Sequence, residues 1–154
     1  MLSKVVTGVT AALMVFAPTA AADDNPPLPN LTGYPPISPV DFTAMSGTWY
    51  AFGTPDGLTC VIDKSRNAYG CSGPIPAAPQ GANLVSGVGG EQPAFANTAA
   101  PVFAVAGVVK QLPPQTRLSY RDVSCAIDAS SATVCVNSAS QHGFMLSPAG
   151  SFTA

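Results

Sequence analysis

The stretch "LTCVIDKSRNAYGCS", Leu58 to Ser72, decides the fold, because it places two cysteines on either side of a short polar segment. Its first half alternates in the way that strands do, and its centre is rich in residues that form turns. If Ser65 and Arg66 form the tip of the turn, Cys60 lies opposite Cys71 on the neighbouring strand. The stretch therefore predicts a β-hairpin.

The chain writes this pattern a second time as "VSCAIDASSATVCV", Val123 to Val136. Cys125 and Cys135 centre on Ser130, which predicts a three-residue loop and a bulge that absorbs the extra residue. In both copies the first cysteine and the isoleucine two positions later share one strand face. The aspartate that follows each isoleucine is expected to hydrogen-bond the turn backbone, and the repeat indicates two equivalent hairpins.

The four cysteines allow three disulfide connectivities. Local pairing, Cys60 with Cys71 and Cys125 with Cys135, is favoured because opposed strand residues have Cα atoms about 4.5 Å apart, within disulfide reach. The alternative joins the hairpins across the core, as in immunoglobulin-like domains. Each closed loop would stabilise the fold by about 3 kcal/mol.

Residues 1–22 have the three parts of a secretory signal peptide: Lys4, an apolar run from Val5 to Ala17, and small residues up to Ala22. The run is shorter than the roughly 20 residues that span a bilayer, and no membrane span is expected after cleavage. We expect a secreted, extracellular protein, with retention at the cell envelope as an alternative. An oxidising compartment agrees with paired cysteines.

Residues 23–45 are rich in proline, which fixes φ and lacks an amide donor, so this part is expected to be an extended spacer. Within it, Pro39 to Met45 is the one helical candidate, with Asp41 as a cap. Residues 46–154 then form a single domain. Its expected strands are Thr48–Phe52, Leu58–Asp63, Ala68–Ser72, Val102–Val105, Arg117–Arg121, Val123–Asp128, Thr133–Asn137 and Gly143–Leu146.

Short strands separated by turn residues predict an all-β domain, a small antiparallel sandwich or barrel stapled by two disulfides. The stretch from Gly73 to Pro101 is rich in Gly, Ala, Pro and Asn and is expected to be a long surface loop. Its Gly87–Gly90 run lacks the strand, helix and Lys-Ser/Thr that a phosphate-binding loop needs.

Composition argues against several partner classes. The chain carries a net charge of −2, and only 9% of its residues are charged, where about 25% is usual. Without a Lys/Arg cluster there is no basis for nucleic-acid binding, which depends on phosphate neutralisation. The cysteine spacing differs from that of zinc sites. We therefore expect no nucleic acid, no metal and no cofactor.

Two residues are weak candidates for a site. His142 is the only histidine, and a hydrolase would need it beside a serine and an orienting aspartate, but the sequence has no Gly-x-Ser-x-Gly elbow around a nucleophile. Trp49 could belong to an exposed aromatic binding surface, although core packing is the simpler expectation.

The segments "FGTPDGLTC" (Phe52 to Cys60), "LSYRDVSCAID" and "HGFMLSPAGSF" resemble a family of small secreted actinobacterial proteins, mycobacterial ones especially. The shared pattern is an aromatic residue, Thr/Ser-Pro-Asp/Ser-Gly, and a cysteine pair, here Cys60 and Cys71. The resemblance implies an exported domain and no particular reaction.

These observations predict a secreted non-catalytic domain that binds a partner or has a structural role in the envelope or outside the cell. The expected partner is an envelope component or another protein. Two alternatives stay open. One is a small secreted hydrolase that uses His142, and the other is a protein inhibitor or effector that presents residues 73–101.

Overall fold

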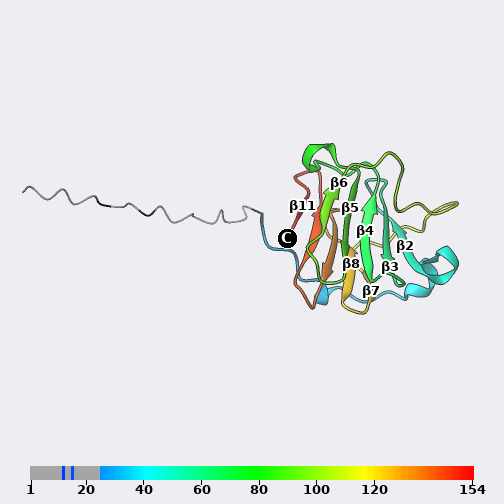
Figure 1. The fold of residues 1–154 in the computed structure, drawn as a ribbon. Coiled ribbons are helices and arrows are strands. Elements are labelled where there is room, and N and C mark those ends of the chain that lie inside the picture. Colours follow the sequence, from blue (N-terminus) through cyan, green and yellow to red (C-terminus); the bar gives the residue numbers. More distant parts are fainter. Residues whose placement is uncertain (1–11, 13–14, 16–24) are drawn as a thin grey trace, which may run out of the picture.

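The computed structural model describes Ala12, Val15 and residues 25–154, so the predicted signal peptide lies almost wholly outside the described residues. Two antiparallel sheets form two layers (Figure 1). The first contains, in spatial order, β1 (Thr43–Ala44), β2 (Trp49–Gly53), β3 (Thr59–Asp63), β4 (Ala68–Ser72), β5 (Leu84–Val88) and β6 (Ala94–Ala96). The second contains β11 (Phe152–Thr153), β10 (Gly143–Leu146), β9 (Thr133–Asn137), β8 (Val123–Ile127) and β7 (Arg117–Tyr120).

The all-β antiparallel architecture is confirmed, and it takes the form of a sandwich. In each sheet, strands that follow one another in the chain are also neighbours in space. Short turns join β3 to β4 and β8 to β9, whereas residues 73–83, with the 3₁₀ helix Pro79–Gly81, join β4 to β5. The two cysteine hairpins occupy matching places. In the first sheet β3 and β4 are flanked by β2 and β5, and in the second β8 and β9 are flanked by β7 and β10.

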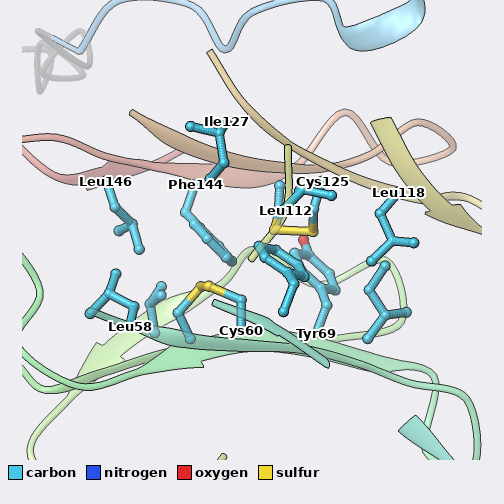
Figure 2. Packing of buried hydrophobic residues seen from close by; sticks show 14 of the residues in the cluster. Leu58, Cys60, Tyr69, Leu112, Leu118, Cys125, Ile127, Phe144 and Leu146 are labelled. Atoms are coloured by element: carbon cyan, nitrogen blue, oxygen red, sulfur yellow. A yellow bond between two sulfur atoms is a disulfide. The ribbon is translucent and has the colours of Figure 1, made fainter. Parts of the chain in front are cut away.

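Both disulfides are local, Cys60–Cys71 with Cα atoms 4.0 Å apart and Cys125–Cys135 with Cα atoms 4.1 Å apart. The hairpin registers place each pair directly opposite, as the turn positions predict. Figure 2 shows the two bridges pointing from opposite sheets into the space between them. All four cysteines are fully buried there, so the bridges are part of the core.

The core between the sheets consists of alternate residues from the inner strand faces (Figure 2). Phe52, Ile62 and Leu118 are among its buried members. Tyr69 and Phe144 stack across the two layers with ring centroids 5.9 Å apart, which fixes how the sheets sit on each other. Burial raises the pKa of Tyr69 to about 12.

The aspartate at the end of each Cys-x-Ile-Asp copy holds its turn, as predicted. Asp63 Oδ1 accepts hydrogen bonds from the Ser65 backbone and hydroxyl at 3.0 and 2.7 Å, and from the Arg66 backbone at 3.1 Å. Asp128 Oδ1 accepts corresponding bonds from Ser130 and from the Ala132 backbone at 2.7–2.9 Å. Burial alone would raise the pKa of Asp63, but the hydrogen bonds outweigh it and lower the pKa.

The stretch 73–101 is not the long structureless loop that its composition predicts. It contains β5, which pairs with β4 along its whole length, and β6 at the sheet edge. The lack of a side chain on Gly87 lets the Tyr69 ring and Pro93 pack closely against the strand, since a Cβ there would lie 3.3 Å from the ring and 3.1 Å from Pro93. The expected strand Val102–Val105 is also wrong, since this stretch forms no strand and contains a bend at Val102 and Phe103, where it packs on the first sheet.

Residues 27–37, which we call the strap, run from the outer face of the second sheet to its edge. Beyond the strap, Phe42 enters the core between the sheets, and β1 joins the edge of the first sheet. The proline-rich stretch is thus packed against both layers over the described residues. In Figure 2 its blue ribbon lies on the side of the second sheet away from the core.

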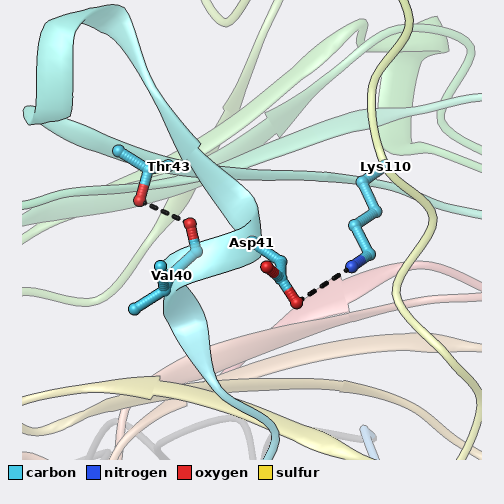
Figure 3. A network of polar contacts seen from close by, with 4 residues as sticks. All are labelled: Val40, Asp41, Thr43 and Lys110. Atoms are coloured by element: carbon cyan, nitrogen blue, oxygen red, sulfur yellow. Dashed lines mark hydrogen bonds and ion pairs between the residues drawn. The ribbon is translucent and has the colours of Figure 1, made fainter.

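The expected helical turn is a 3₁₀ helix, Pro39–Phe42, which ends earlier than predicted. Asp41 lies inside it and makes no capping hydrogen bond. Instead its carboxylate lies 3.3 Å from Lys110 Nζ, and the Thr43 hydroxyl donates to the Val40 carbonyl oxygen at 2.8 Å (Figure 3). The ion pair is exposed on both sides and contributes little to stability.

Residues 101–112, which we call the connecting segment, cover the outer face of the first sheet around Phe103 and end at Leu112, which is buried in the core between the sheets. Phe103 packs on the outer face with Ala51, Val61 and Leu84. The segment ends at a parallel bridge between Gly53 and Gln111. Each sheet therefore has its outer face covered by a stretch that forms no strand.

Candidate ligand-binding groove

The strap crosses the outer face of the second sheet and is held there by apolar contacts. Leu31 is buried on Ala126 and Val134, which are the outward-facing residues of β8 and β9. Leu28 lies over β10, where the absence of a side chain on Gly143 makes room, since a Cβ would come within 3.0 Å of Leu28 Cδ1. The outward-facing residues of β8, β9 and β10 thus form an apolar surface on which Leu28 and Leu31 pack.

The local conformation of the strap follows from its sequence. Asn30 Oδ1 accepts hydrogen bonds from the backbone and hydroxyl of Thr32 at 3.0 and 2.8 Å, which starts the 3₁₀ helix Leu31–Gly33. The strap then pairs with β7 through one parallel bridge, Pro36 with Arg117. The Ile37 amide donates to the Arg117 carbonyl, and the Arg117 amide donates to the Pro35 carbonyl, both at 2.9 Å. A single bridge suits proline, which lacks an amide donor.

Between the strap and the sheet lies a groove with a volume of about 710 Å³. This volume is within the range of roughly 300–1,000 Å³ that small-molecule sites occupy. The strap contributes apolar side chains, among them Leu28 and Leu31. The sheet contributes Arg117, Ser119 and Ser124 at its β7 and β8 side.

Two arginines give the groove its charge. Arg117 and Arg121 both line it, whereas among the residues that the structure describes no aspartate or glutamate side chain does. Asp122 follows Arg121 in the β7–β8 turn but is exposed and outside the lining. A chain of net charge −2 therefore places two cations at one small site.

Neither guanidinium is committed to a protein carboxylate within residues 25–154. Arg117 Nε is buried and finds no hydrogen-bond partner in the described part of the chain, which is costly for a polar atom. Arg121 lies with its guanidinium carbon 5.3 Å from the Tyr120 ring centroid. Within residues 25–154 its guanidinium forms no ion pair with a carboxylate.

Hydroxyl and amide groups surround the arginines. Ser119 and Ser124 are cross-strand partners, and their hydroxyls share a hydrogen bond of 2.7 Å. Ser138 and Gln141 also line the groove, and the Gln141 side-chain amide donates to the Ser138 carbonyl at 2.6 Å. Val136 adds an apolar surface. The groove thus combines cations, hydrogen-bonding groups and apolar walls.

His142 lies beside this groove and is not one of its lining residues. Its Nδ1 is 3.1 Å from the backbone oxygen of Ala154, which does line the groove and also accepts a hydrogen bond from the Gly143 amide. Within the described residues, neither a side-chain hydroxyl nor a side-chain carboxylate hydrogen-bonds to the ring. The serine, histidine and aspartate that a hydrolase would use are not brought together here.

Trp49 is half-buried on the outer face of the first sheet, far from the strap in the fold. Its ring meets Phe103 edge to face, with centroids 5.9 Å apart. Tyr50 and Phe52, on the other face of β2, point inward. Trp49 thus packs on the covered outer face of the first sheet and not in the core between the sheets.

The cysteines are all in disulfides, and residues 25–154 bring together no group of three or more potential metal ligands. In the same part of the chain no helix is long and apolar enough to cross a membrane.

The matching place on the first sheet is filled. There Phe103 packs so closely on the strands that a Cβ on Gly70 would lie 2.6 Å from its ring. On the second sheet, Leu31 covers Ala126 and Val134 but leaves the groove open beside β7. Both sheets carry a covering segment on their outer face. The strap on the second sheet leaves a groove beside Arg117 and Arg121, whereas Phe103 of the connecting segment fills the corresponding place on the first sheet.

Sequence reasoning did not identify Arg117 and Arg121 as site residues. A signal was present, because "RLSYR" alternates basic or hydroxyl residues with Leu118 and Tyr120, which places Arg117, Ser119 and Arg121 on one face. The sequence did not indicate that a distant segment would cover this face.

Comparisons with protein-family models, curated proteins and solved structures give no match for this chain.

Proposed function

We propose that this protein is a secreted binding module that takes a small molecule into the groove between the strap and the second sheet. The observation that supports this most directly is the groove itself, with two arginines that have no carboxylate partner among the described residues. Ligand sites are typically concave, mostly apolar and equipped with a few polar groups, and the groove has all three properties.

Export to the extracellular space or the cell envelope belongs to the same proposal. Two buried disulfides suit an oxidising compartment, and the first 22 residues have the pattern of a signal peptide. The resemblance to small secreted actinobacterial proteins supports the same location. A binding module in that setting would capture or present a molecule that occurs outside the cytoplasm.

Binding is favoured over hydrolysis by the surroundings of His142. A hydrolase needs a nucleophile whose proton a base can take, with both groups in hydrogen-bond reach. The ring of His142 instead faces the Ala154 backbone, and Ser140 contacts the His142 backbone amide at 3.3 Å and not the ring. The described hydroxyls are thus not placed for such a step.

A fluorescent probe tests the groove without knowledge of the natural ligand. Nile red, an uncharged apolar dye, should bind the purified protein with a rise in emission. Ser124→Phe places a ring in the groove and should abolish this rise. Ser86→Phe is a matched control, because Ser86 is also a half-buried serine in mid-strand but lies in β5 of the other sheet. Equal emission from both variants would refute the groove as a binding site.

A further inference from the structure

From the arrangement of charge in the groove we infer the class of its ligand: a single-chain amphiphile with an anionic head group, a carboxylate or a phosphate ester. This inference rests on the proposed binding function and names what the site takes. Its first support is charge complementarity, since Arg117 and Arg121 line one small groove in a chain of net negative charge.

The guanidinium groups are equipped to bind an oxyanion. Arginine presents N–H donors in a planar fork that matches a carboxylate or phosphate in two parallel hydrogen bonds. The only ion pair within residues 25–154 joins Lys110 and Asp41 at another part of the surface, so neither arginine is neutralised there. The guanidinium carbon of Arg121 lies 5.3 Å from the Tyr120 ring centroid.

Neighbouring hydroxyls extend this polar end. The Ser119 and Ser124 hydroxyls lie on the same outward face as Arg117, on paired strands. Because either oxygen can donate in their shared hydrogen bond, the pair can turn a proton toward an incoming anion. An anionic head group at this end would therefore meet hydrogen-bond donors from both side-chain types.

The other wall of the groove is apolar and matches an apolar tail on the ligand. Leu28, Leu31 and Val136 line it, and the prolines of the strap present carbon surface without amide donors. A small inorganic anion would leave this wall exposed to water, whereas an alkyl chain would bury it, which is favourable for apolar surface. The combination of two cations and an apolar wall thus fits an amphiphile better than either a free phosphate or a neutral lipid.

A competition experiment tests the ligand class. Dodecanoate, dodecyl phosphate, dodecan-1-ol and dodecyltrimethylammonium, each below its aggregation concentration, are titrated against Nile red bound to the purified protein. The two anions should displace the dye at least tenfold more tightly than the alcohol, and the cation should bind weakest. A stronger effect of dodecanoate than of dodecyl phosphate, or the reverse, identifies the head group.

Arginine variants show whether the charge preference arises in the groove. Arg117→Gln and Arg121→Gln should each weaken dodecanoate binding by about tenfold to a hundredfold, the range for hydrogen bonds to charged groups, and leave the alcohol unaffected. Arg121→Lys should retain part of the affinity. Arg66→Gln, an exposed arginine in the β3–β4 turn, is the control and should change nothing.

The outcomes separate the inference from the function on which it rests. If Nile red binding is lost in Ser124→Phe but anion and alcohol displace the dye equally, the groove binds ligands and the anionic class is wrong. If the anions are preferred but Arg117→Gln and Arg121→Gln bind them unchanged, the inference is also wrong. If the dye never depends on Ser124, the proposed function itself is refuted.

Discussion

Leu31 and Phe103 occupy corresponding positions on opposite outer faces of the sandwich. Each of them covers the sheet that is more distant in the sequence or already complete, and not the sheet that its own segment leads into. Leu31 precedes the first sheet and covers the second, whereas Phe103 precedes the second sheet and covers the first. Each covering segment ends at a parallel bridge to the first long strand of the sheet it covers. The segment that precedes each sheet thus packs on the outer face of the other sheet, which links the two halves of the chain.

This arrangement predicts different consequences for the two covers. Leu31→Ala should lower the free energy of unfolding by about 2 kcal/mol, because a buried leucine is removed. It should also weaken Nile red binding, because the strap forms one wall of the groove. Chemical denaturation and dye titration of the same variant measure both effects.

Phe103→Ala should cost more stability, about 3 kcal/mol, and leave dye binding unchanged, because Phe103 lies on the other sheet. The comparison to make is the loss of dye affinity relative to the loss of stability, which should be large for Leu31→Ala and close to zero for Phe103→Ala. Loss of dye binding in Phe103→Ala at a temperature where the protein is folded would contradict the separation of the two faces.

The two disulfides should stabilise the protein by similar amounts. They close loops of nearly equal length, with sequence separations of 11 and 10, and both are fully buried. Replacing either pair by serines should therefore lower the free energy of unfolding by about 3 kcal/mol. Urea denaturation of the two double variants measures this, and peptide mapping without reduction checks the pairing Cys60–Cys71 and Cys125–Cys135. A mapped bridge between the two hairpins would refute the structure of the core.

Gly70 should not tolerate a side chain. A Cβ there would lie 2.6 Å from the Phe103 ring and 2.9 Å from the Ser86 Cα, and it would also overlap the Val85 carbonyl oxygen. Gly70→Ala should thus destabilise the protein by about 2 kcal/mol or more through overpacking. Gly33→Ala is the matched control, since a Cβ at Gly33 meets nothing within 4 Å. Thermal unfolding should show a clear decrease in Tm for the first variant and almost none for the second.

The Asp63 carboxylate should make stability depend on acid pH. Its pKa is lowered in the folded state, so its contribution is complete above the unfolded value of about 4 and is lost as the pH falls through the folded-state pKa. Asp63→Asn should therefore destabilise the protein by about 1 kcal/mol at pH 7, and the difference from the unchanged protein should vanish in strong acid.

Urea denaturation between pH 7 and pH 2 measures this difference. Asp122→Asn, which removes an exposed carboxylate in the β7–β8 turn, is the control for the loss of one negative charge. A constant difference between Asp63→Asn and the unchanged protein over the whole pH range would show that the turn hydrogen bonds do not depend on ionisation.

Local relationships made much of this fold predictable. In both hairpins the cysteine pairing depends only on the turn position and on side-chain alternation, which act over about ten residues. For the same reason Asp63 and Asp128 could be assigned to turns, and Cys60 and Cys125 to the strand faces of Ile62 and Ile127. The strands Ala68–Ser72, Thr133–Asn137 and Gly143–Leu146 have the predicted bounds.

The features that sequence reasoning missed depend on contacts between distant parts of the chain. The glycine-rich stretch around Gly87 becomes β5 because β4 offers a paired edge and the Tyr69 ring fills the space above the glycine. The apolar run Val102–Val105 reads as a strand, but the first sheet binds it by side-chain packing through Phe103 and not by a strand ladder.

The sequence by itself therefore determined the two disulfide hairpins, the all-β class and the outward alternation that puts Arg117 and Ser119 on one strand face. Tertiary structure alone decided that the proline-rich strap lies over that face and turns it into a groove. The physical reason is that proline excludes the strap from a sheet ladder but leaves its leucines free to pack. Where those leucines bind depends on the apolar outer face that Ala126 and Val134 present, nearly a hundred residues later in the chain.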